Sequence, residues 1–342
     1  MQRKVKLGVI GAGAFSVGHL DGIDLADNCE TIAICDIDLK KAQEKAERFH
    51  IPFVYTDYHE LLKREDIEAV TVPLPDQLHR QISVDALKAG KHVLCEKPMA
   101  LNMEDCQEMI AAARESGKIL MVGQIGRYTP CFNKAIEILE SGEIGELFFV
   151  ESEYAHDYSR IGGTGGWRVT PERHPVIGGG CHAVDLVRRI AGNPMEVFAY
   201  SNHKILTDWP VDDCTIAVLK FPNNVVGKVM TSVGCKRKYT MRTVIYGSKG
   251  TLIVDPLLPY ITMYRTKRDS EDRFSGQSYG IDIPVSIDDH NCRGEVTDFC
   301  NAILENKLTS CTGEEGAATV AACLAIVESA ATGMPVKVSY DF

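Results

Sequence analysis

The 342-residue sequence contains no hydrophobic run long enough to cross a bilayer. Its longest nearly unbroken apolar stretch, residues 316–327, has twelve residues, whereas a membrane-spanning helix needs about 20. No block of lysine or arginine is present either, and the formal net charge is −10. We therefore expect neither a membrane nor a nucleic acid among the partners of this protein.

Cysteine spacings typical of metal sites are also absent. The twelve cysteines include no Cys-x-x-Cys pair, and none lies near a histidine at zinc-finger spacing. Cys35, Cys95 and Cys323 fall inside apolar runs, which is typical of small buried side chains in a reducing compartment. The first expected strand begins within four residues of the start, which leaves no room for a secretory leader. We therefore expect no metal site and a cytoplasmic location.

The first thirty-eight residues carry the most informative pattern. An apolar strand, 5–10, leads into Gly11-Ala12-Gly13, a helix over 14–26 follows, and a second apolar strand, 31–35, ends at Asp36. Gly11 permits a tight turn, Gly13 lets backbone N–H groups approach a pyrophosphate, and Asp36 can accept hydrogen bonds from a ribose. The pattern predicts a dinucleotide-binding site.

The glycine motif departs from its usual form at one position. Ser16 stands where a third glycine or an alanine is usual. The alternative, a glycine-rich turn in some other α/β domain, leaves Asp36 unexplained. An acid at this place repels a 2′-phosphate, and neither Ile37 nor Asp38 offers a group that would bind one. We therefore expect NAD as the cofactor, in preference to NADP.

Strands and helices alternate as far as residue 124. The expected further strands are 53–55, 67–72, 92–95 and 119–122, and the expected further helices are 40–49, 57–63, 77–89 and 103–115. Asp57, with Glu60 completing a capping box, and Asp76 are the expected helix N-caps, and Gly90 is an expected C-cap. This alternation predicts an α/β domain over residues 1–124 with a doubly wound, parallel Rossmann sheet.

A different pattern begins at residue 125. The chain is too long for one typical core, and residues 125–342 predict an α+β domain with a large, mostly antiparallel open sheet. The expected strands are 147–154, 195–201, 215–221, 225–233, 243–246, 251–254 and 336–338, and the expected helices are 129–139, 181–191, 294–305 and 313–332. An uncovered sheet face commonly becomes a subunit contact, so we expect a homodimer or homotetramer.

Cys95-Glu96-Lys97-Pro98 is the first candidate for chemistry outside the glycine motif. It follows the fifth strand, and ligands of open α/β sheets bind outside the carboxyl ends of the strands. Lys97 is therefore expected to point toward the bound dinucleotide. The alternative is an ordinary charged turn in contact with solvent.

The second candidate is Gly178-Gly179-Gly180-Cys181-His182, which leads into a helix. Three glycines let the chain pass close to something bulky, and the helix places His182 and Asp185 on one face. The positive end of the helix dipole favours a neutral His182, whereas Asp185 favours a protonated ring. A capping histidine beside a structural aspartate is the open alternative. Single histidines elsewhere, such as His19, His50 and His203, are interpreted as structural.

Together these motifs resemble the glucose-fructose oxidoreductase / inositol dehydrogenase / MocA family over nearly the whole chain. The similarity rests on the Gly-x-Gly opening, on Ala89-Gly90-Lys91-His92-Val93-Leu94-Cys95-Glu96-Lys97-Pro98, on Arg127, on the Gly-x-His-x-x-Asp of 180–185 and on Ser329-Ala330-Ala331-Thr332-Gly333-Met334-Pro335-Val336. The resemblance implies that Lys97 and His182 are catalytic. Lys97 would orient the reacting hydroxyl, and His182 would take its proton while hydride moves to the nicotinamide.

The glycine motif and the resemblance together define the expected site. The expected cofactor-binding residues are Gly11, Ala12, Gly13, Ala14, Phe15, Asp36, Leu74, His79, Glu96, Lys97 and Gln124. The expected substrate-binding residues are Lys97, Arg127, Tyr128, Asp157, Trp167, Arg168, His182 and Asp185.

One position departs from the family pattern. Sugar and cyclitol dehydrogenases of the family often carry an aspartate four residues before the histidine, and here that position is Gly178. Either His182 works with Lys97 alone, or another carboxylate such as Asp157 replaces the missing acid. Trp167 could stack on a sugar ring or fill the core of the second domain.

The leading interpretation is an NAD-dependent dehydrogenase acting on a secondary hydroxyl of a sugar, cyclitol or glycoside. One alternative is an NAD-dependent glycosidase, which oxidises a sugar carbon transiently and accumulates no NADH. Another is a non-catalytic, sugar-sensing regulator, although a pure binder has no use for the pair Lys97 and His182.

Overall fold

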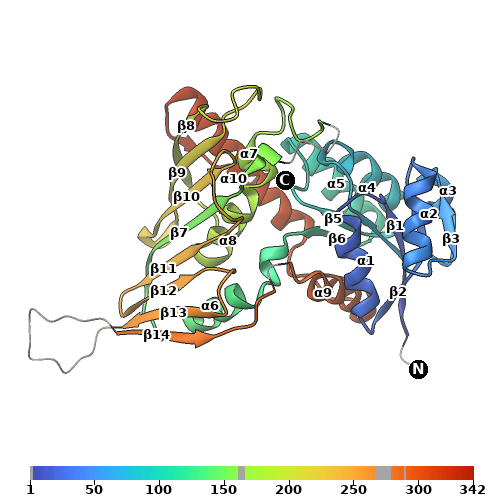
Figure 1. Ribbon diagram of the computed structural model, residues 1–342, viewed down its shortest axis with the longest axis horizontal. Helices are drawn as coiled ribbons and strands as arrows, with labels where there is room; N and C mark the ends of the chain where they lie inside the picture. The colour runs from blue at the N-terminus through green and yellow to red at the C-terminus, as the bar shows by residue number, and fades with distance from the viewer. Residues whose placement is uncertain (1–2, 161–165, 266–278, 289) are drawn as a thin grey trace, which may run out of the picture. The chain divides into compact units, whose positions relative to one another are not determined.

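The computed structural model describes residues 3–160, 166–265, 279–288 and 290–342 (Figure 1). Contacts within the chain define two compact units. The first comprises residues 1–128, 290–320 and 341–342, and the second comprises residues 129–289 and 321–340. The chain thus leaves the first unit close to the expected boundary at 124, but residues 290–320 return to it.

The first unit contains a six-stranded sheet in the order β3-β2-β1-β4-β5-β6. The strands are β1 (Val5–Ile10), β2 (Cys29–Cys35), β3 (Phe53–Tyr55), β4 (Ala69–Val72), β5 (His92–Glu96) and β6 (Leu120–Gly123). Every ladder between them is parallel. The strand order reverses between β1 and β4, the place where open α/β sheets bind ligands. The predicted Rossmann fold is confirmed.

Helices accompany this sheet at the expected places. They are α1 (Ser16–Leu25), α2 (Leu39–Arg48), α3 (Tyr58–Leu62), α4 (His79–Lys88) and α5 (Met103–Ser116). Val9 and Ile10 of β1 point to opposite faces and are both buried, as expected for a strand covered on both faces. Gly90, two residues after α4, and Gly117, directly after α5, adopt positive φ values of 76° and 64°, as left-handed residues at helix ends do.

One expected helix start and one expected capping box differ from the structure. Asp76 begins a short 3-10 helix, Asp76–Leu78, and α4 starts only at His79. Pro75 holds an extended backbone at ψ 140° just before this tighter turn, so the α-helical hydrogen bonds begin one turn later. Asp57 does cap α3, but Glu60 forms an ion pair with Lys63 and not the return bond of a capping box.

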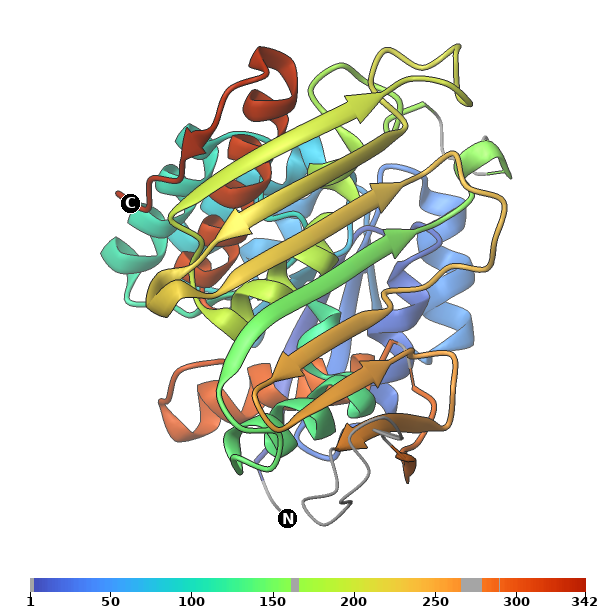
Figure 2. The ribbon, with the colours of Figure 1, turned by 90° about the vertical axis from the view of Figure 1, so that its left-hand side faces the viewer.

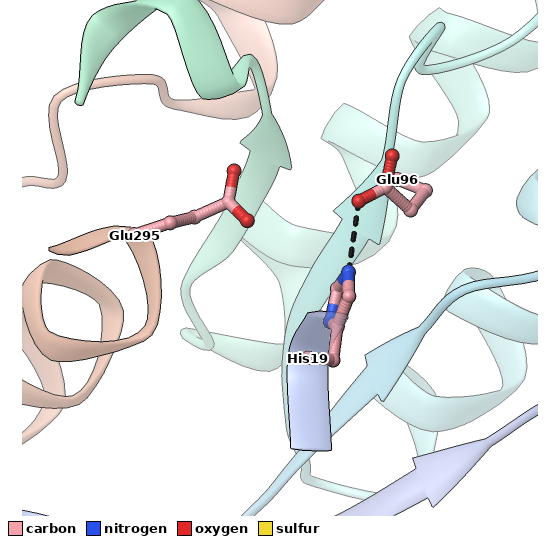
Figure 3. A group of neighbouring side chains, drawn as sticks. All are labelled: His19, Glu96 and Glu295. Carbon is pink, nitrogen blue, oxygen red and sulfur yellow. Dashed lines mark hydrogen bonds and ion pairs between the residues drawn. The ribbon is translucent and has the colours of Figure 1, made fainter. Parts of the chain in front are cut away.

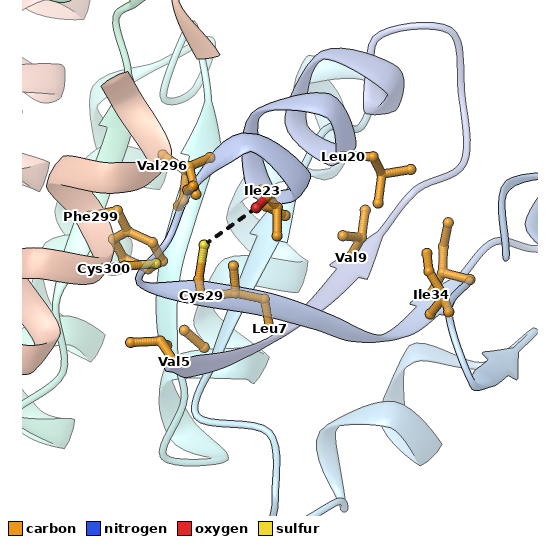
Figure 4. Packing of buried hydrophobic residues seen from close by; sticks show 14 of the residues in the cluster. Val5, Leu7, Val9, Leu20, Ile23, Cys29, Ile34, Val296, Phe299 and Cys300 are labelled. Carbon is orange, nitrogen blue, oxygen red and sulfur yellow. Dashed lines mark hydrogen bonds between the residues drawn. The ribbon is translucent and has the colours of Figure 1, made fainter. Parts of the chain in front are cut away.

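The segment that returns to the first unit packs through α9 (Cys292–Glu305) against α1. Figure 4 shows Val296, Phe299 and Cys300 of α9 beside Ile23 of α1, in one buried cluster with the residues of β1. The contact is close because Gly22 faces α9. A Cβ atom at Gly22 would lie 2.8 Å from the backbone carbonyl of Cys292. α9 is therefore part of the core of the first unit.

The second unit contains a nine-stranded sheet in the order β14-β13-β12-β11-β7-β10-β9-β8-β15. The strands are β7 (Leu147–Ala155), β8 (Glu196–Asn202), β9 (Cys214–Lys220), β10 (Val226–Ser232), β11 (Thr243–Gly247), β12 (Gly250–Val254), β13 (Tyr260–Arg265), β14 (Tyr279–Pro284) and β15 (Val336–Lys337). All ladders are antiparallel except the one between β7 and β10. The predicted mostly antiparallel sheet is confirmed, and β13 and β14 are strands that the sequence pattern did not reveal.

One face of this sheet is covered by helices. The helices of the second unit are α6 (Pro130–Glu140), α7 (Pro175–Gly178), α8 (Cys181–Ala191) and the later part of α10 (Gly313–Thr332). α8 packs on β7 and β10. Figure 2 looks onto the opposite face, across which no α-helix of the described chain lies.

α10 is the one described helix that is long and apolar enough, by length and composition alone, to cross a membrane. Its 18-residue window has a mean hydropathy of 1.2, and 61% of that window is buried inside the protein. Burial of this kind is typical of a core helix, because apolar surface removed from water by packing needs no lipid.

Candidate functional site

The glycine loop has the geometry that the motif predicts. Gly11 adopts a φ of +116°, and a Cβ atom there would lie 2.8 Å from Cδ2 of Leu74. Gly13, in contrast, has no atom within 4 Å of its Cβ position. The backbone at Gly11 is thus closed to any side chain, whereas the space beside Gly13 is open for a ligand to approach the main chain.

Ser16 explains how the third motif position works without glycine. Its side chain is fully buried, and its hydroxyl donates a hydrogen bond of 2.7 Å to the carbonyl of Gly13. The hydroxyl therefore ties the loop to the first residue of α1 and leaves the N–H groups of the loop in place.

Asp36 is held by the main chain at the end of β2. Its carboxylate accepts hydrogen bonds from the N–H groups of Ala12, at 2.7 Å, and Asp38, at 2.9 Å. Each oxygen keeps a further lone pair for a ribose hydroxyl. Gln124, after β6, is 1% exposed, and its Oε1 atom has no hydrogen-bond partner among the described residues. An open main-chain loop, an anchored acid and a buried amide that needs a partner together fit NAD.

His79 connects two loops at the carboxyl edge of the sheet. Its ring nitrogens lie 2.8 Å from the carbonyl of Pro98 and 3.0 Å from the carbonyl of Leu74. Because both partners only accept, the ring satisfies both when it is protonated. Burial alone would lower the pKa of His79, but Cys95, Asp76 and the Pro98 carbonyl outweigh it and raise the pKa to about 10.

Lys97 follows directly after β5, where its side chain is half-buried. Its backbone N–H lies 3.2 Å from Oε2 of Glu96, and Oε1 of Glu96 lies 2.8 Å from Nε2 of buried His19. Glu96 is therefore an anchored carboxylate beside Lys97. The cofactor contacts of Glu96, Phe15 and Ala14 stay predictions.

Arg127 and Tyr128 contact other parts of the first unit. The guanidinium of Arg127 donates to the carbonyl of Ser310 and, at 2.8 Å, to Glu315. The hydroxyl of Tyr128 donates to Asp298 at 2.7 Å. These bonds attach the segment after β6 to α9 and to the start of α10. A role of either residue in substrate binding stays a prediction.

In the second unit, His182 lies in the first turn of α8 and is buried. Its ring stacks on Tyr154, with ring centres 6.0 Å apart and planes 21° apart. The hydroxyl of Tyr154 in turn lies 2.9 Å from that of Tyr158 and 3.1 Å from Nδ1 of His156. The sequence motifs did not reveal this aromatic, hydrogen-bonded support of His182.

Each of the three glycines before α8 lies so close to another residue that a side chain would not fit. A Cβ atom at Gly179 would lie 2.5 Å from the ring of Tyr154, and one at Gly180 would overlap the hydroxyl of Thr231. One at Gly178 would overlap the guanidinium of Arg173, whose Nη2 donates to the Gly178 carbonyl at 3.1 Å. The expected close approach is thus present, and a buried cation occupies the space beside Gly178.

Asp185 and Asp157 are both engaged with cations. Asp185, buried one turn after His182, lies 3.6 Å from Nη1 of Arg188. Asp157 accepts from Ser159 and, at 3.0 Å, from Lys236. The Ser159 hydroxyl and Lys236 lower the pKa of Asp157 to about 2. Asp157 therefore stays ionised near neutral pH and is a poor acceptor for a proton.

Arg168 lines a cavity in the second unit, and Trp167 precedes it in the chain. The Arg168 guanidinium stacks 4.3 Å from the centre of the Trp167 ring, and Trp167 is half-buried, so it does not fill the core. The cavity has a volume of about 330 Å³ and is lined by Arg168, Tyr158, Trp209 and Asp208 among others. Its aromatic faces and hydrogen-bonding groups suit a small polar ring.

Two family profiles match the chain. Residues 5–124 match the oxidoreductase family with an NAD-binding Rossmann fold, and residues 132–253 match the GFO/IDH/MocA C-terminal domain. This chain belongs to the GFO/IDH/MocA oxidoreductase family. It is an NAD-binding oxidoreductase, and the predicted family and cofactor are confirmed.

Named relatives of this oxidoreductase include enzymes for cyclic polyols and sugars. A myo-inositol 2-dehydrogenase of Thermotoga maritima is 28% identical over 73% of this chain and 75% of the relative. A 1,5-anhydro-D-fructose reductase of Ensifer adhaerens is 28% identical over 97% of this chain and 98% of the relative. A levoglucosan dehydrogenase solved with NADH has the same fold, with a TM-score of 0.90 at 24% identity over 98% of this chain and 100% of that chain.

Proposed function

We propose that this oxidoreductase is an NAD-dependent dehydrogenase that moves hydride between a secondary hydroxyl of a sugar or cyclitol and the nicotinamide. The observation that carries the proposal is the placement of Lys97. Lys97 follows β5 directly, at the carboxyl edge of a sheet whose β1–α1 loop and Asp36 fit NAD. This edge is where open α/β sheets bind their ligands.

Lys97 and His182 have complementary roles in this proposal. Lys97 orients the reacting hydroxyl and lowers the energy of the alkoxide character that develops on it. His182 takes the hydroxyl proton, and its stack on Tyr154 fixes the orientation of the ring. NAD supplies the hydride acceptor when it is bound.

The chemistry of the second unit supports a cyclic, hydroxyl-rich substrate. Trp209 offers a half-buried ring to the apolar side of a sugar, and Arg168 and Asp208 offer donors and acceptors to its hydroxyls. The names of the inositol and anhydrofructose enzymes among the relatives agree with this class. Asp185, Asp157 and Trp167 remain the further substrate contacts that we propose.

We also propose that the chain assembles into a homodimer or homotetramer and works in the cytoplasm. Large apolar side chains, among them Tyr200, Ile216 and Val218, are exposed on strands of the nine-stranded sheet, and buried apolar area is what stabilises subunit contacts. All twelve cysteines are free thiols, which supports a reducing compartment.

The test is NADH formation with a panel of free sugars, inositols and glycosides. We expect Lys97→Met to lower kcat/KM by about 10²- to 10⁴-fold, because the cation at the developing alkoxide is lost. NAD affinity, measured by fluorescence titration, should change much less. Lys88→Met, on the exposed end of α4, is the matched control and should keep the parental rate.

Two results would contradict the proposal. Release of an aglycone without NADH would instead support the glycosidase, and an unchanged rate in Lys97→Met would remove Lys97 from the reaction.

A further inference from the structure

Three ionisable side chains from distant segments meet inside the first unit. They are His19 of α1, Glu96 at the end of β5 and Glu295 of α9 (Figure 3). One polar atom from each lies within 4.8 Å of the others, and the residues are 0%, 7% and 1% exposed. This His19–Glu96–Glu295 cluster is next to Lys97, because Lys97 follows Glu96 in the chain and its backbone N–H donates to the Glu96 carboxylate.

The two carboxylates flank Gly123 of β6. The Cβ position of Gly123 lies 3.2 Å from Oε1 of Glu96 and 3.2 Å from Oε1 of Glu295, so a side chain there would crowd both acids. In Figure 3 the Glu295 side chain points from α9 toward the Glu96–His19 pair. The two acids therefore share the space beside a glycine at the end of β6.

The two acids have unequal partners. The Glu96 side chain forms hydrogen bonds with Nε2 of His19 and with the backbone N–H of Lys97. Both bonds stabilise a carboxylate. Oε1 of Glu295 is buried and has no hydrogen-bond partner among the described residues, and the same holds for Nδ1 of His19. A buried charge without such partners is strongly unfavourable. If one of the two acids carries a proton, it is Glu295.

We propose that the His19–Glu96–Glu295 cluster holds a proton on Glu295 at neutral pH, so that Lys97 faces one carboxylate charge behind it and not two. Glu295 is then a positioning residue for Lys97. The role of Glu295 toward Lys97 rests on the proposed function, whereas the protonation state of Glu295 does not.

The surrounding charges agree with this assignment. Burial raises the pKa of Glu295 well above its usual range, Glu96 and Asp298 raise it further, and Lys97 opposes them. Burial also acts to raise the pKa of Glu96, but His19, Lys97 and His79 together lower it. Tyr128, whose hydroxyl donates to Asp298, is a further titratable group beside α9.

The sign of the effect on folding follows from a raised acid pKa. The unfolded chain releases the Glu295 proton near pH 4.5, whereas the folded chain keeps it. The contribution of Glu295 to the free energy of unfolding is therefore lost as the pH rises from about 4.5 to the pKa of Glu295 in the folded protein. Glu295→Gln is a neutral copy of the protonated acid and carries no such loss.

The first experiment uses the NAD-bound protein and needs no substrate. We expect an infrared carboxylic-acid C=O band at pH 7.5 in the wild type that is absent in Glu295→Gln. Relative to this variant, the unfolding constant of the wild type should rise by up to tenfold per pH unit above pH 5. Glu305→Gln, exposed on the same helix, should leave the band and the pH dependence unchanged.

An absent band, or a stability difference that does not vary with pH, would overturn the proton on Glu295. A stoichiometric divalent metal in the purified wild type, lost in Glu295→Gln, would overturn it as well and would also contradict the expectation of no metal. These results are independent of whether the protein oxidises any sugar.

The second experiment tests the role toward Lys97 with a substrate found by the panel. We expect kcat of the wild type to fall at alkaline pH, where Glu295 ionises, and this limb to be missing in Glu295→Gln. Glu295→Asp, which keeps an acid, should restore a pH-dependent limb. An alkaline profile identical in wild type and Glu295→Gln would overturn the role toward Lys97 and leave the proton on Glu295 standing.

Discussion

Arg173 determines which side chain fits at position 178, four residues before His182, the catalytic histidine that we propose. The buried guanidinium of Arg173 fills the space that a side chain at Gly178 would need. A carboxylate at this position therefore has to displace a cation that is already bonded to the Gly178 carbonyl. The aspartate that the family resemblance leads us to expect here cannot simply be added to this chain.

We predict that Gly178→Asp does not raise activity and lowers the free energy of unfolding by about 1–3 kcal/mol, because the new side chain overpacks the site. Urea denaturation and initial rates of NADH formation measure the two effects. The double variant Arg173→Ala, Gly178→Asp makes room and should recover part of the stability lost through overlap. A single Gly178→Asp variant that is both stable and faster would show that Arg173 moves aside.

At the same scale, the sequence predicted those site residues whose signal is local. Gly11 and Asp36 are recognisable because the loop geometry requires them at a fixed spacing, and the structure gives both the expected surroundings. Glu295 gave no such signal. It stands about 200 residues after Glu96, and only the packing of α9 on α1 brings the two together.

Helix α1 shows how one element serves both the loop and the core. Gly13 lies at the open end before the helix, and Gly22 lies on the face that meets α9. An alanine inside an exposed helix is usually about 1 kcal/mol better than a glycine. At Gly22 the close backbone of Cys292 removes that advantage.

We predict opposite outcomes for two Gly→Ala variants of this element. Gly22→Ala should lower the free energy of unfolding by about 1–3 kcal/mol, because the methyl group meets backbone that cannot rotate away. Gly13→Ala should change stability by less than about 0.5 kcal/mol but weaken NAD binding at least about tenfold, because the methyl group occupies the space where the pyrophosphate approaches. Thermal unfolding and NADH fluorescence separate the two. Undiminished NAD affinity in Gly13→Ala would contradict the cofactor site.

Most elements were predictable from their apolar pattern, because β1 and α10 are largely apolar throughout and β7 alternates between the two faces of its sheet. β13 and β14 were not. β13 gives only a weak alternating signal, with Ile261 and Met263 as its buried residues. The connection between the two strands is too long to give a hairpin signal of the kind that Asn-Gly or Gly-x turns give.

At the scale of the whole molecule, length alone predicted two domains, and the sheet types followed from the spacing of the elements. The membership of residues 290–320 in the first unit was not predictable. An amphipathic helix such as α9 shows which face it buries, but not against which partner, and the partner here is α1 at the far end of the sequence.

The open face of the nine-stranded sheet leads to the last prediction, on assembly. Ile216 is 45% exposed and pairs across the strands with Tyr200 and Met230, so no cation stands opposite it. We predict that Ile216→Glu shifts the protein from a dimer or tetramer toward the monomer, because a charge would have to be buried in the contact. Since the residue is exposed in the single chain, the fold should lose little stability. Size-exclusion chromatography with light scattering measures the shift, and Ile216→Thr, which keeps a β-branched neutral side chain, is the control that should assemble. A wild type that stays monomeric at every concentration would show that this face does not mediate assembly.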